Sequence, residues 1–320
     1  MMTLTPDLMM LCPPRPVAMA RLRASYRVHR WDLAPDKEGF MAEHGPKCRA
    51  VATSGHIPVT RRMLEAMPDL GIVACSSAGF EAFDIAALAG RNIALTNTSA
   101  ALCGDVADAA IMLMLAARRS LVSADAYVRS GGWGRNGMFP LQRTIGGRSL
   151  GIVGMGAIGQ AIASRAAGFG MKIGYWNRRP RDVPWSYHPD LTALARNSDN
   201  LVIAVAGGPE TRGLISARVI EALGPEGLLV NVARGSVIDE PALIAALSDG
   251  RLGAAALDVY AHEPDPDPRL AALSNVTLFP HHASGTVETR DAMAQLMVDN
   301  LDAYFAGRPL VTPVDLSRYL

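Results

Sequence analysis

A glycine-rich turn in the middle of the chain constrains the fold more than any other segment. Gly154-Met-Gly-Ala-Ile-Gly159 follows a short apolar run, 149–153, and opens a helical pattern that starts at Ala157. Gly154 permits a tight turn out of a strand, Gly156 leaves room for a pyrophosphate, and Gly159 lets the helix lie close to the sheet. The helix N-terminus adds unpaired N–H groups that attract an anion. With a strand before it and a helix after it, the turn predicts a dinucleotide-binding site at Gly154, Met155, Gly156, Ala157, Ile158 and Gly159.

The segments after this turn alternate between strand and helix patterns. Short apolar runs predict strands at 150–153, 172–176, 200–205, 228–231, 254–258 and 276–279. Helical patterns lie between most of these runs, at 157–168, 190–196, 216–223 and 240–247, and a final helix is expected at 286–305. Such repeated strand–helix units predict an α/β fold with a doubly wound parallel sheet, which has helices on both faces.

The first third of the chain shows the same alternation. Strands are predicted at 51–54, 71–75 and 92–96, and short helices at 61–67 and 84–89. Each of these strands ends in small or polar residues, and open parallel sheets bind ligands at the carboxyl ends of their strands. A longer helix is expected at 105–119 and another at 121–130, whereas the glycine-rich segment 131–147 breaks the periodicity and predicts a loop.

Composition excludes several classes of protein. A chain of 320 residues is long enough for two domains, and 49% hydrophobic against 19% charged residues exclude global disorder. A formal net charge of +1 gives no electrostatic basis for binding nucleic acid or an anionic membrane. The four cysteines show no Cys-x-x-Cys spacing, so neither a zinc site nor a disulfide framework is expected. The N-terminus lacks a secretory pattern, and the longest apolar run, 109–117, is too short to cross a bilayer, so we expect a cytoplasmic protein without a metal.

The strand after the glycine turn ends in a sequence that bears on the cofactor. NAD-binding folds carry a carboxylate for the ribose hydroxyls about 20 residues after the turn. This chain has Asn177 near that place, followed by Arg178, Arg179 and, further on, Arg181. Two guanidinium groups there would pair with a 2′-phosphate. We therefore predict NADP(H) as the preferred cofactor and NAD(H) as a weaker one; the alternative is that these arginines are solvated surface charges.

Three later segments lie at predicted strand ends and carry groups suited to acid–base chemistry. They are 230–235 with Arg234, 257–264 with Glu263, and 279–286 with the adjacent His281 and His282. Together with the segments 96–98, 104–108 and 209–215, they make nearly the whole chain resemble the D-isomer-specific 2-hydroxyacid dehydrogenases. The pattern is most similar to the glyoxylate/hydroxypyruvate reductases and the related hydroxyphenylpyruvate reductases.

The resemblance implies a role for each of these groups. Arg234 would bind the substrate, His281 would be the acid/base, and Glu263 would be its partner. The chemistry agrees, because a protonated histidine can neutralise the oxygen of a 2-keto acid that accepts a hydride, and a planar guanidinium can hold the substrate carboxylate. The family motif assigns His281; a shift of one residue would assign His282 instead.

The resemblance also implies further contacts with cofactor and substrate. The cofactor residues expected outside the glycine turn are Val106, Asn177, Arg178, Arg179, Ala206, Pro209, Thr211, Val232, Ala233, Arg234, Asp258, His281 and Ser284. For the substrate carboxylate we expect Ser54, Gly55, Ala78 and Gly79 beside Arg234, since backbone N–H groups in such loops bind anions. The alternative is that both loops are ordinary turns.

The resemblance further implies how the chain is divided. A flavodoxin-like substrate domain, residues 1–99 with 288–320, would contain an inserted Rossmann cofactor domain, residues 100–287. The family forms dimers largely through the cofactor domain, and the helix from Asp105 and the 131–147 loop, with Trp133, Met138 and Phe139, are candidates for the interface.

We therefore expect an NADPH-dependent reductase of small 2-keto acids such as glyoxylate and hydroxypyruvate. An NAD-linked D-3-phosphoglycerate or D-lactate dehydrogenase is a second possibility, which the Asn-Arg-Arg sequence at 177–179 disfavours. The expectation that no regulatory domain follows residue 320 disfavours the long phosphoglycerate enzymes. A nucleotide-sensing binding protein without catalysis is a third possibility, which the complete set of Arg234, Glu263 and His281 disfavours.

Overall fold

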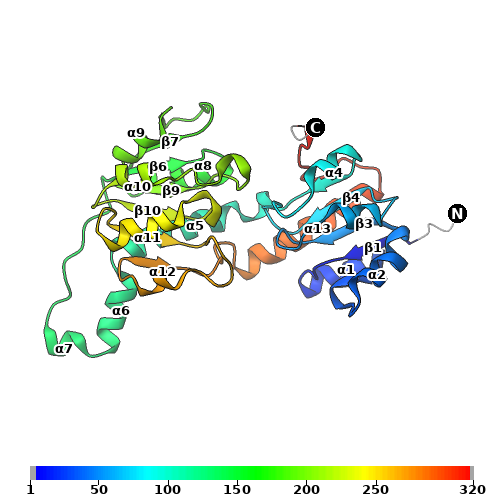
Figure 1. Ribbon diagram of the computed structural model, residues 1–320, viewed down its shortest axis with the longest axis horizontal. Coiled ribbons are helices and arrows are strands. Elements are labelled where there is room, and N and C mark those ends of the chain that lie inside the picture. The colour runs from blue at the N-terminus through cyan, green and yellow to red at the C-terminus, as the bar shows by residue number, and fades with distance from the viewer. Residues whose placement is uncertain (1–4, 318–320) are drawn as a thin grey trace. The chain divides into compact units, whose positions relative to one another are not determined.

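The computed structural model describes residues 5–317, which form two compact units. The first unit takes the chain up to Leu102 and again from Gly285, and the second takes Cys103–Ser284. In Figure 1 each unit contains a sheet with helices on both of its faces. The second unit thus interrupts the first in sequence, while the predicted roles of the two segments, substrate binding for 1–99 with 288–320 and cofactor binding for 100–287, stay a prediction.

The first unit contains a five-stranded sheet in the order β2-β1-β3-β4-β5. All four pairings within it are parallel. This is the doubly wound order of flavodoxin-like folds. Its strands are β1 Asp7–Met10, β2 Arg27–Arg30, β3 Cys48–Thr53, β4 Ile72–Cys75 and β5 Ala94–Thr96, and its helices are α1 Pro16–Ser25, α2 Lys37–His44, α3 Arg61–Glu65, α4 Ile85–Gly90 and α13 Val287–Phe305.

The strands of this sheet are buried on both faces, which explains their continuous apolar sequences. In β1, Met9 packs in the core that also contains Leu64 of α3. Its neighbour Leu8 packs in the core on the other face, with Leu301 of α13. Because successive side chains of a strand point to opposite faces, the short strand contributes to both cores.

The second unit contains a seven-stranded sheet in the order β12-β11-β10-β9-β6-β7-β8, and all its pairings are parallel. Strand order reverses between β6 and β9, which makes this the topological switch point of the sheet. Its strands are β6 Ser149–Val153, β7 Lys172–Trp176, β8 Ser186–Tyr187, β9 Asn200–Ile203, β10 Leu228–Asn231, β11 Ala254–Leu257 and β12 Val276–Leu278, and its helices are α6 Leu121–Arg129, α7 Gly132–Asn136, α8 Ala157–Ala167, α9 Leu191–Arg196, α10 Ala217–Leu223, α11 Glu240–Ser248 and α12 Pro268–Ala272, with α5 Ser99–Arg118 crossing the boundary between the units.

The prediction of two parallel-sheet α/β units is confirmed, and several local predictions were incomplete. The segment 131–147, predicted as a loop, contains the short helix α7, which follows Gly131 in the left-handed conformation (φ 71°). The helix predicted at 105–119 begins at Ser99 instead, after Asn97, whose side-chain oxygen accepts the Ser99 N–H. The sequence analysis did not predict β1, β2, β8, α1, α2 and α12.

Helix α5 is the one described helix that is long and apolar enough to cross a membrane. One side of the helix nevertheless lies inside the protein, since Ala107, Ala110 and Met114 are fully buried, whereas Met112 is 45% exposed. This is the pattern of a core helix in an α/β protein, as the sequence predicted for the apolar run at 109–117.

The segment 121–141, which we call the arm, extends away from the sheet of its own unit (Figure 1). It contains α6 and α7 and leaves large apolar side chains exposed, namely Leu121, Val122, Val128, Trp133, Met138 and Leu141. A pocket of about 560 Å³ lies near its ends, lined by Val122 and Leu141 on the arm side and by Glu226 and Asn275 on the sheet side. Glu226 and Asn275 precede β10 and β12, so the pocket lies at the amino ends of the strands. The glycine turn lies at the opposite, carboxyl ends.

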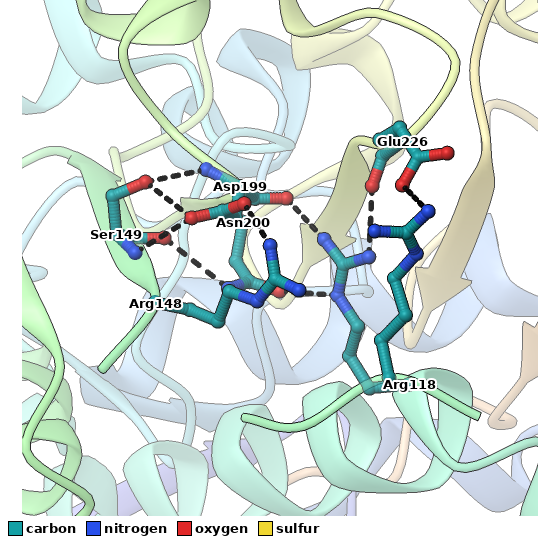
Figure 2. Close-up of polar contacts among 7 residues, drawn as sticks. Arg118, Arg148, Ser149, Asp199, Asn200 and Glu226 are labelled. Atoms are coloured by element: carbon teal, nitrogen blue, oxygen red, sulfur yellow. Dashed lines mark hydrogen bonds and ion pairs between the residues drawn. The ribbon is translucent and has the colours of Figure 1, made fainter. Parts of the chain in front are cut away.

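A polar cluster at the same edge joins α5 to the amino ends of three strands (Figure 2). Arg118, the last residue of α5, donates to the side-chain oxygen of Asn200 (2.7 Å), the carbonyl oxygen of Glu226 (2.8 Å) and the carbonyl oxygen of Asp199. The Asp199 carboxylate accepts from the Ser149 N–H (2.8 Å), the Ser149 hydroxyl (2.7 Å) and Arg148 (3.0 Å). Burial alone would raise the pKa of Asp199, but the bonds from Ser149 and Arg148 hold this pKa below its usual range.

We predict that Asp199→Ala lowers the free energy of unfolding by about 1–3 kcal/mol at neutral pH, because Ser149 and Arg148 lose an ionised acceptor. The pKa of Asp199 is lowered in the folded protein, so its stabilisation is complete above the ordinary value of about 3.9 and is lost as pH falls through the folded value. Urea unfolding from pH 7 to pH 3 measures this, with the exposed Asp182→Ala as control. A difference between variant and wild type that does not shrink at low pH would contradict the assignment.

Candidate active site

The carboxyl ends of the parallel strands bring most of the predicted site residues of the second unit to one edge of its sheet. The glycine turn follows β6, and Asn177, Arg178 and Arg179 follow β7 beside it. On the other side, Ala206, Pro209 and Thr211 follow β9, and Val232, Ala233 and Arg234 follow β10. Asp258 and Glu263 follow β11, and His281 and Ser284 follow β12. These predicted cofactor and acid–base residues therefore share the carboxyl-end edge of the sheet, which is where open parallel sheets bind ligands.

The glycine turn has the geometry that a pyrophosphate requires. Gly154 adopts φ 102°, which side chains disfavour, and a Cβ on Gly159 would lie 2.0 Å from the carbonyl oxygen of Gly154. A Cβ on Gly156 would meet no atom within 4 Å, so this glycine faces open space at the start of α8. No side chain caps α8 at Gly156, which leaves the first N–H groups of the helix to an anion. The turn fits a bound dinucleotide.

Two tyrosine hydroxyls bond to the backbone of the loop after β7. Tyr175 is buried, and its hydroxyl accepts the N–H of Arg181 (2.8 Å), while the Tyr187 hydroxyl donates to the carbonyl oxygen of Asn177 (3.2 Å). The loop keeps the side chains of Arg178 and Arg179 exposed. Arg178 forms an ion pair with Glu210, which belongs to the loop after β9. The sequence analysis did not foresee this pair, and Glu210 carries no pattern that distinguishes it from a surface acid.

The loop after β9 closes on itself through Thr211. Its hydroxyl donates to the carbonyl oxygen of Ala206 (2.8 Å), and its N–H donates to Gly208. The loop that contains the short helix Pro209–Thr211 starts beside the glycine turn, because β9 pairs with β6 and Ala204 lies against Gly154.

His281 and Glu263 are in direct contact. The distance from His281 Nδ1 to Glu263 Oε2 is 2.6 Å, and the two side chains are 31% and 29% exposed. The other carboxylate oxygen, Glu263 Oε1, accepts the N–H of Tyr260 (2.9 Å). A carboxylate bonded to one ring nitrogen fixes the orientation of the imidazole and directs its other nitrogen, Nε2, away from the pair.

The segment that carries His281 is fixed by Asp258. The carboxylate of this buried residue accepts the N–H groups of His282 (2.6 Å) and Ala283 (3.1 Å). The backbone carbonyl oxygen of Asp258 accepts the N–H of His281 (2.7 Å). Burial raises the pKa of Asp258, against the backbone bonds that lower it. His281 itself has φ 48°. A left-handed conformation is uncommon for a residue with a side chain, and such residues gather at functional sites.

Arg234 is presented by a turn that Asn231 organises. The fully buried Asn231 side chain donates to the carbonyl oxygen of Arg234 (2.9 Å) and accepts the N–H of Ala233 (3.0 Å). A Cβ on Gly235 would lie 1.8 Å from the carbonyl carbon of Tyr260, so only glycine lets the Arg234 turn rest on the loop that leads to Glu263. The Arg234 and Glu263 segments are therefore packed backbone to backbone.

The predicted substrate residues lie together in the first unit. A Cβ on Gly55 would be 2.0 Å from the carbonyl oxygen of Gly79, so the loops after β3 and β4 touch through their backbones. The N–H of Gly55 donates to Ser77 Oγ (3.1 Å), and Asn97 donates to the carbonyl oxygen of Ala78 (3.1 Å). These bonds bring the Ser54–Gly55 and Ala78–Gly79 loops to the same end of this sheet.

Val106 is placed in α5, where it is buried. Its segment adjoins α8, because Arg165 of α8 bonds to Asp108 (2.6 Å) and to the carbonyl oxygen of Gly104 (3.2 Å).

Comparison with known proteins agrees with this geometry. Residues 111–283 match the family model of the D-isomer specific 2-hydroxyacid dehydrogenase, NAD binding domain. The chain is 42% identical to glyoxylate/hydroxypyruvate reductase A of Arabidopsis thaliana over 96% of this chain and 98% of that protein. It is 40% identical to 2-ketogluconate reductase of Gluconobacter oxydans over 98% of this chain and 100% of that protein.

Solved structures show the same likeness. A 2-hydroxyacid dehydrogenase from Ketogulonicigenium vulgare superposes with a TM-score of 0.93 at 46% identity, covering 98% of this chain and 99% of that one. A second solved structure is an NADPH-dependent glyoxylate/hydroxypyruvate reductase from Sinorhizobium meliloti in complex with NADP and malonate. It superposes with a TM-score of 0.89 at 37% identity, covering 98% of both chains. The chain belongs to the D-isomer specific 2-hydroxyacid dehydrogenase family, and its second unit contains the NAD-binding domain of that family.

Proposed function

We propose that this protein catalyses the NADPH-dependent reduction of small 2-keto acids, such as glyoxylate and hydroxypyruvate, to D-2-hydroxy acids. The observation that carries the proposal is the contact between His281 and Glu263 (2.6 Å), on the same sheet edge as Arg234 and the glycine turn. The Arabidopsis and Sinorhizobium relatives are both named as glyoxylate/hydroxypyruvate reductases.

The proposed chemistry divides between the cofactor and the protein. The bound nicotinamide supplies the hydride that the carbonyl carbon accepts. His281, with Nδ1 engaged by Glu263, donates a proton from Nε2 to the keto oxygen as negative charge develops there. Glu263 stabilises the imidazolium that holds this proton before transfer. Arg234 holds the substrate carboxylate through its planar guanidinium. No metal is needed, because a proton neutralises the oxygen.

We propose that Ser54, Ala78 and Gly79 contribute polar groups that bind the substrate carboxylate. Gly55 has a different part, because its N–H donates to Ser77 and its missing side chain lets the two loops meet. The other predicted cofactor contacts are likewise proposed to line the dinucleotide site, namely Val106, Met155, Ala157, Ile158, Ala206, Pro209, Thr211, Val232, Ala233, Asp258 and Ser284.

The preference for NADP(H) is proposed from the loop after β7. Asn177 replaces the acid that would bind a 2′-hydroxyl and repel a 2′-phosphate, and Arg178 and Arg179 are exposed beside it. Arg178 pairs with Glu210, but both side chains are more than 70% exposed. Such pairs stabilise a protein by less than about 1 kcal/mol, so a phosphate can replace the Glu210 carboxylate.

We further propose that the protein is a cytoplasmic homodimer that binds neither nucleic acid nor membrane. The arm supports the dimer, because Trp133, Met138 and Leu141 are 65%, 79% and 89% exposed, and apolar anchors of this kind mark protein interfaces. A second copy of the chain is the proposed partner of this arm. Sedimentation equilibrium showing a monomer at micromolar concentration would overturn this assembly.

An assay of NADPH and NADH oxidation with glyoxylate, hydroxypyruvate, phenylpyruvate, 2-ketogluconate, pyruvate and phosphohydroxypyruvate tests the function. We expect the highest kcat/KM with glyoxylate or hydroxypyruvate; 2-ketogluconate is included because of the Gluconobacter relative. Turnover only with NADH and pyruvate or phosphohydroxypyruvate would favour the D-lactate or D-3-phosphoglycerate alternatives. NADPH binding without turnover of any keto acid would favour a nucleotide-sensing protein.

The adjacent histidines provide a matched test of the proton donor. We predict that His281→Ala lowers kcat by about 10²–10⁴-fold, the usual contribution of general acid catalysis, while the Kd for NADPH is nearly unchanged. His282→Ala should keep near-normal turnover, because its exposed side chain is not bonded to Glu263. The reverse result would assign the role to His282.

The arginines give a test of cofactor choice. We predict that the double variant Arg178→Ala/Arg179→Ala raises KM for NADPH by about tenfold or more and that for NADH far less, since loss of two charge-assisted bonds costs about 1.5–3 kcal/mol each. Arg212→Ala, at another exposed arginine, serves as control. An unchanged ratio of the two KM values would mean that Arg178 and Arg179 are solvated charges.

A further inference from the structure

The loop that leads from β11 to Glu263 has little packing of its own. Ala261, His262 and Glu263 are all exposed, whereas the strand before them is buried. The position of the Glu263 carboxylate therefore depends on a few specific bonds to the backbone of residues 260–261. The Tyr260 N–H bonds to Glu263 itself, whereas the Ala261 N–H bonds to a residue outside the three groups proposed to act on the substrate.

One of these bonds comes from a buried acid at the start of α11. The N–H of Ala261 donates to Glu240 Oε2 at 2.9 Å, and Glu240 is only 8% exposed. Glu240 is the first residue of α11, after Asp239, whose side chain caps the helix by accepting the Ala242 N–H. A buried charge is costly without partners, so the bond to Ala261 is part of what makes its burial tolerable.

Ala261 is held on its other side by the Arg234 turn. Gly235 approaches so closely that a Cβ there would lie 2.4 Å from the Ala261 nitrogen. Next to it, the Tyr260 hydroxyl donates to the carbonyl oxygen of Phe279 (2.8 Å) and accepts the Phe279 N–H (3.1 Å). Burial, together with the charges of Asp258, Glu263 and Glu240, raises the pKa of Tyr260 to about 12 against the lowering effect of the bond to Phe279, so this phenol stays protonated and able to donate.

The Ala261 nitrogen thus lies against both the Glu240 carboxylate and the Gly235 backbone. Next to it, Tyr260 donates its N–H to Glu263 Oε1, and Glu263 Oε2 meets His281 Nδ1. A chain of three bonds, from Glu240 through the 260–261 backbone and Glu263, ends at the imidazole.

We propose that Glu240 is a positioning residue, which fixes the Glu263 carboxylate against His281 by holding the Ala261 N–H. This inference rests on the proposed function, since it assigns Glu240 a part in the same proton transfer. Nothing about Glu240 requires contact with substrate or cofactor, so its loss is expected in kcat and not in cofactor binding.

The test compares three substitutions in the full chain with glyoxylate and NADPH. Glu240→Ala removes the acceptor and should lower kcat by about 10–100-fold, as displacements near 1 Å do in active sites. Glu240→Gln keeps an oxygen at the same reach and should stay within about threefold of wild type. Glu240→Asp keeps the charge but withdraws it by one methylene, and should lower kcat although its melting temperature stays near that of wild type. The Kd for NADPH should be unchanged in all three.

A double variant separates positioning from a merely structural role. In a Glu263→Gln background, adding Glu240→Ala should lower kcat by less than about threefold, because the two residues act on one contact. If the losses in kcat from Glu240→Ala and Glu263→Gln simply multiply in the double variant, the proposal is overturned. A wild-type kcat in Glu240→Ala alone would also overturn it. If Glu240→Ala fails to fold, Glu240→Asp gives the answer: wild-type kcat there also overturns it. Absence of turnover in the wild-type protein would instead refute the proposed function itself.

Discussion

The parallel run of all strands in the second unit is the constraint on which the site depends. Because each strand enters from the same side, the seven carboxyl ends form one edge, and the loops that follow them become neighbours in the order of the sheet. Residues more than 100 positions apart, such as Gly156 and His281, thereby serve one face. The close approach of Gly159 to the Gly154 carbonyl then sets where the first of these loops ends and α8 begins.

The reactive groups are placed mainly by backbone contacts. Asp258 holds the N–H groups of residues 282 and 283, Asn231 holds both sides of the Arg234 turn, and Gly235 rests on the Tyr260 carbonyl. These bonds act on the backbone of the segments that carry Arg234 and His281, and so fix where each segment lies. This agrees with preorganisation, in which polar groups are fixed before the reaction begins.

Much of this could be predicted from the sequence, for identifiable reasons. Six strands of the second sheet were found because they lie in short, mostly apolar runs, and the glycine turn was found because a strand precedes it and a helix follows it; the two-residue β8 is too short to give such a signal. Strand β2 was missed because it is an edge strand with the polar sequence Arg27-Val-His-Arg30, which has no buried residue. Glu240 was missed because an acid in the first turn of a helix is ordinary, and only the coordinates show that it is buried against the Ala261 N–H.

The polar cluster of Ser149, Asp199 and Arg118 lies at the amino ends of the strands (Figure 2), whereas Arg234, Glu263 and His281 follow the carboxyl ends of strands in the same sheet. The contacts predicted to stabilise the fold and the residues proposed for the reaction thus lie at opposite ends of the strands of this sheet. A programme of directed evolution can for this reason accumulate stabilising changes around the cluster without the usual trade against activity. The stability gained there would leave room for the more disruptive substitutions that altering the substrate pocket demands.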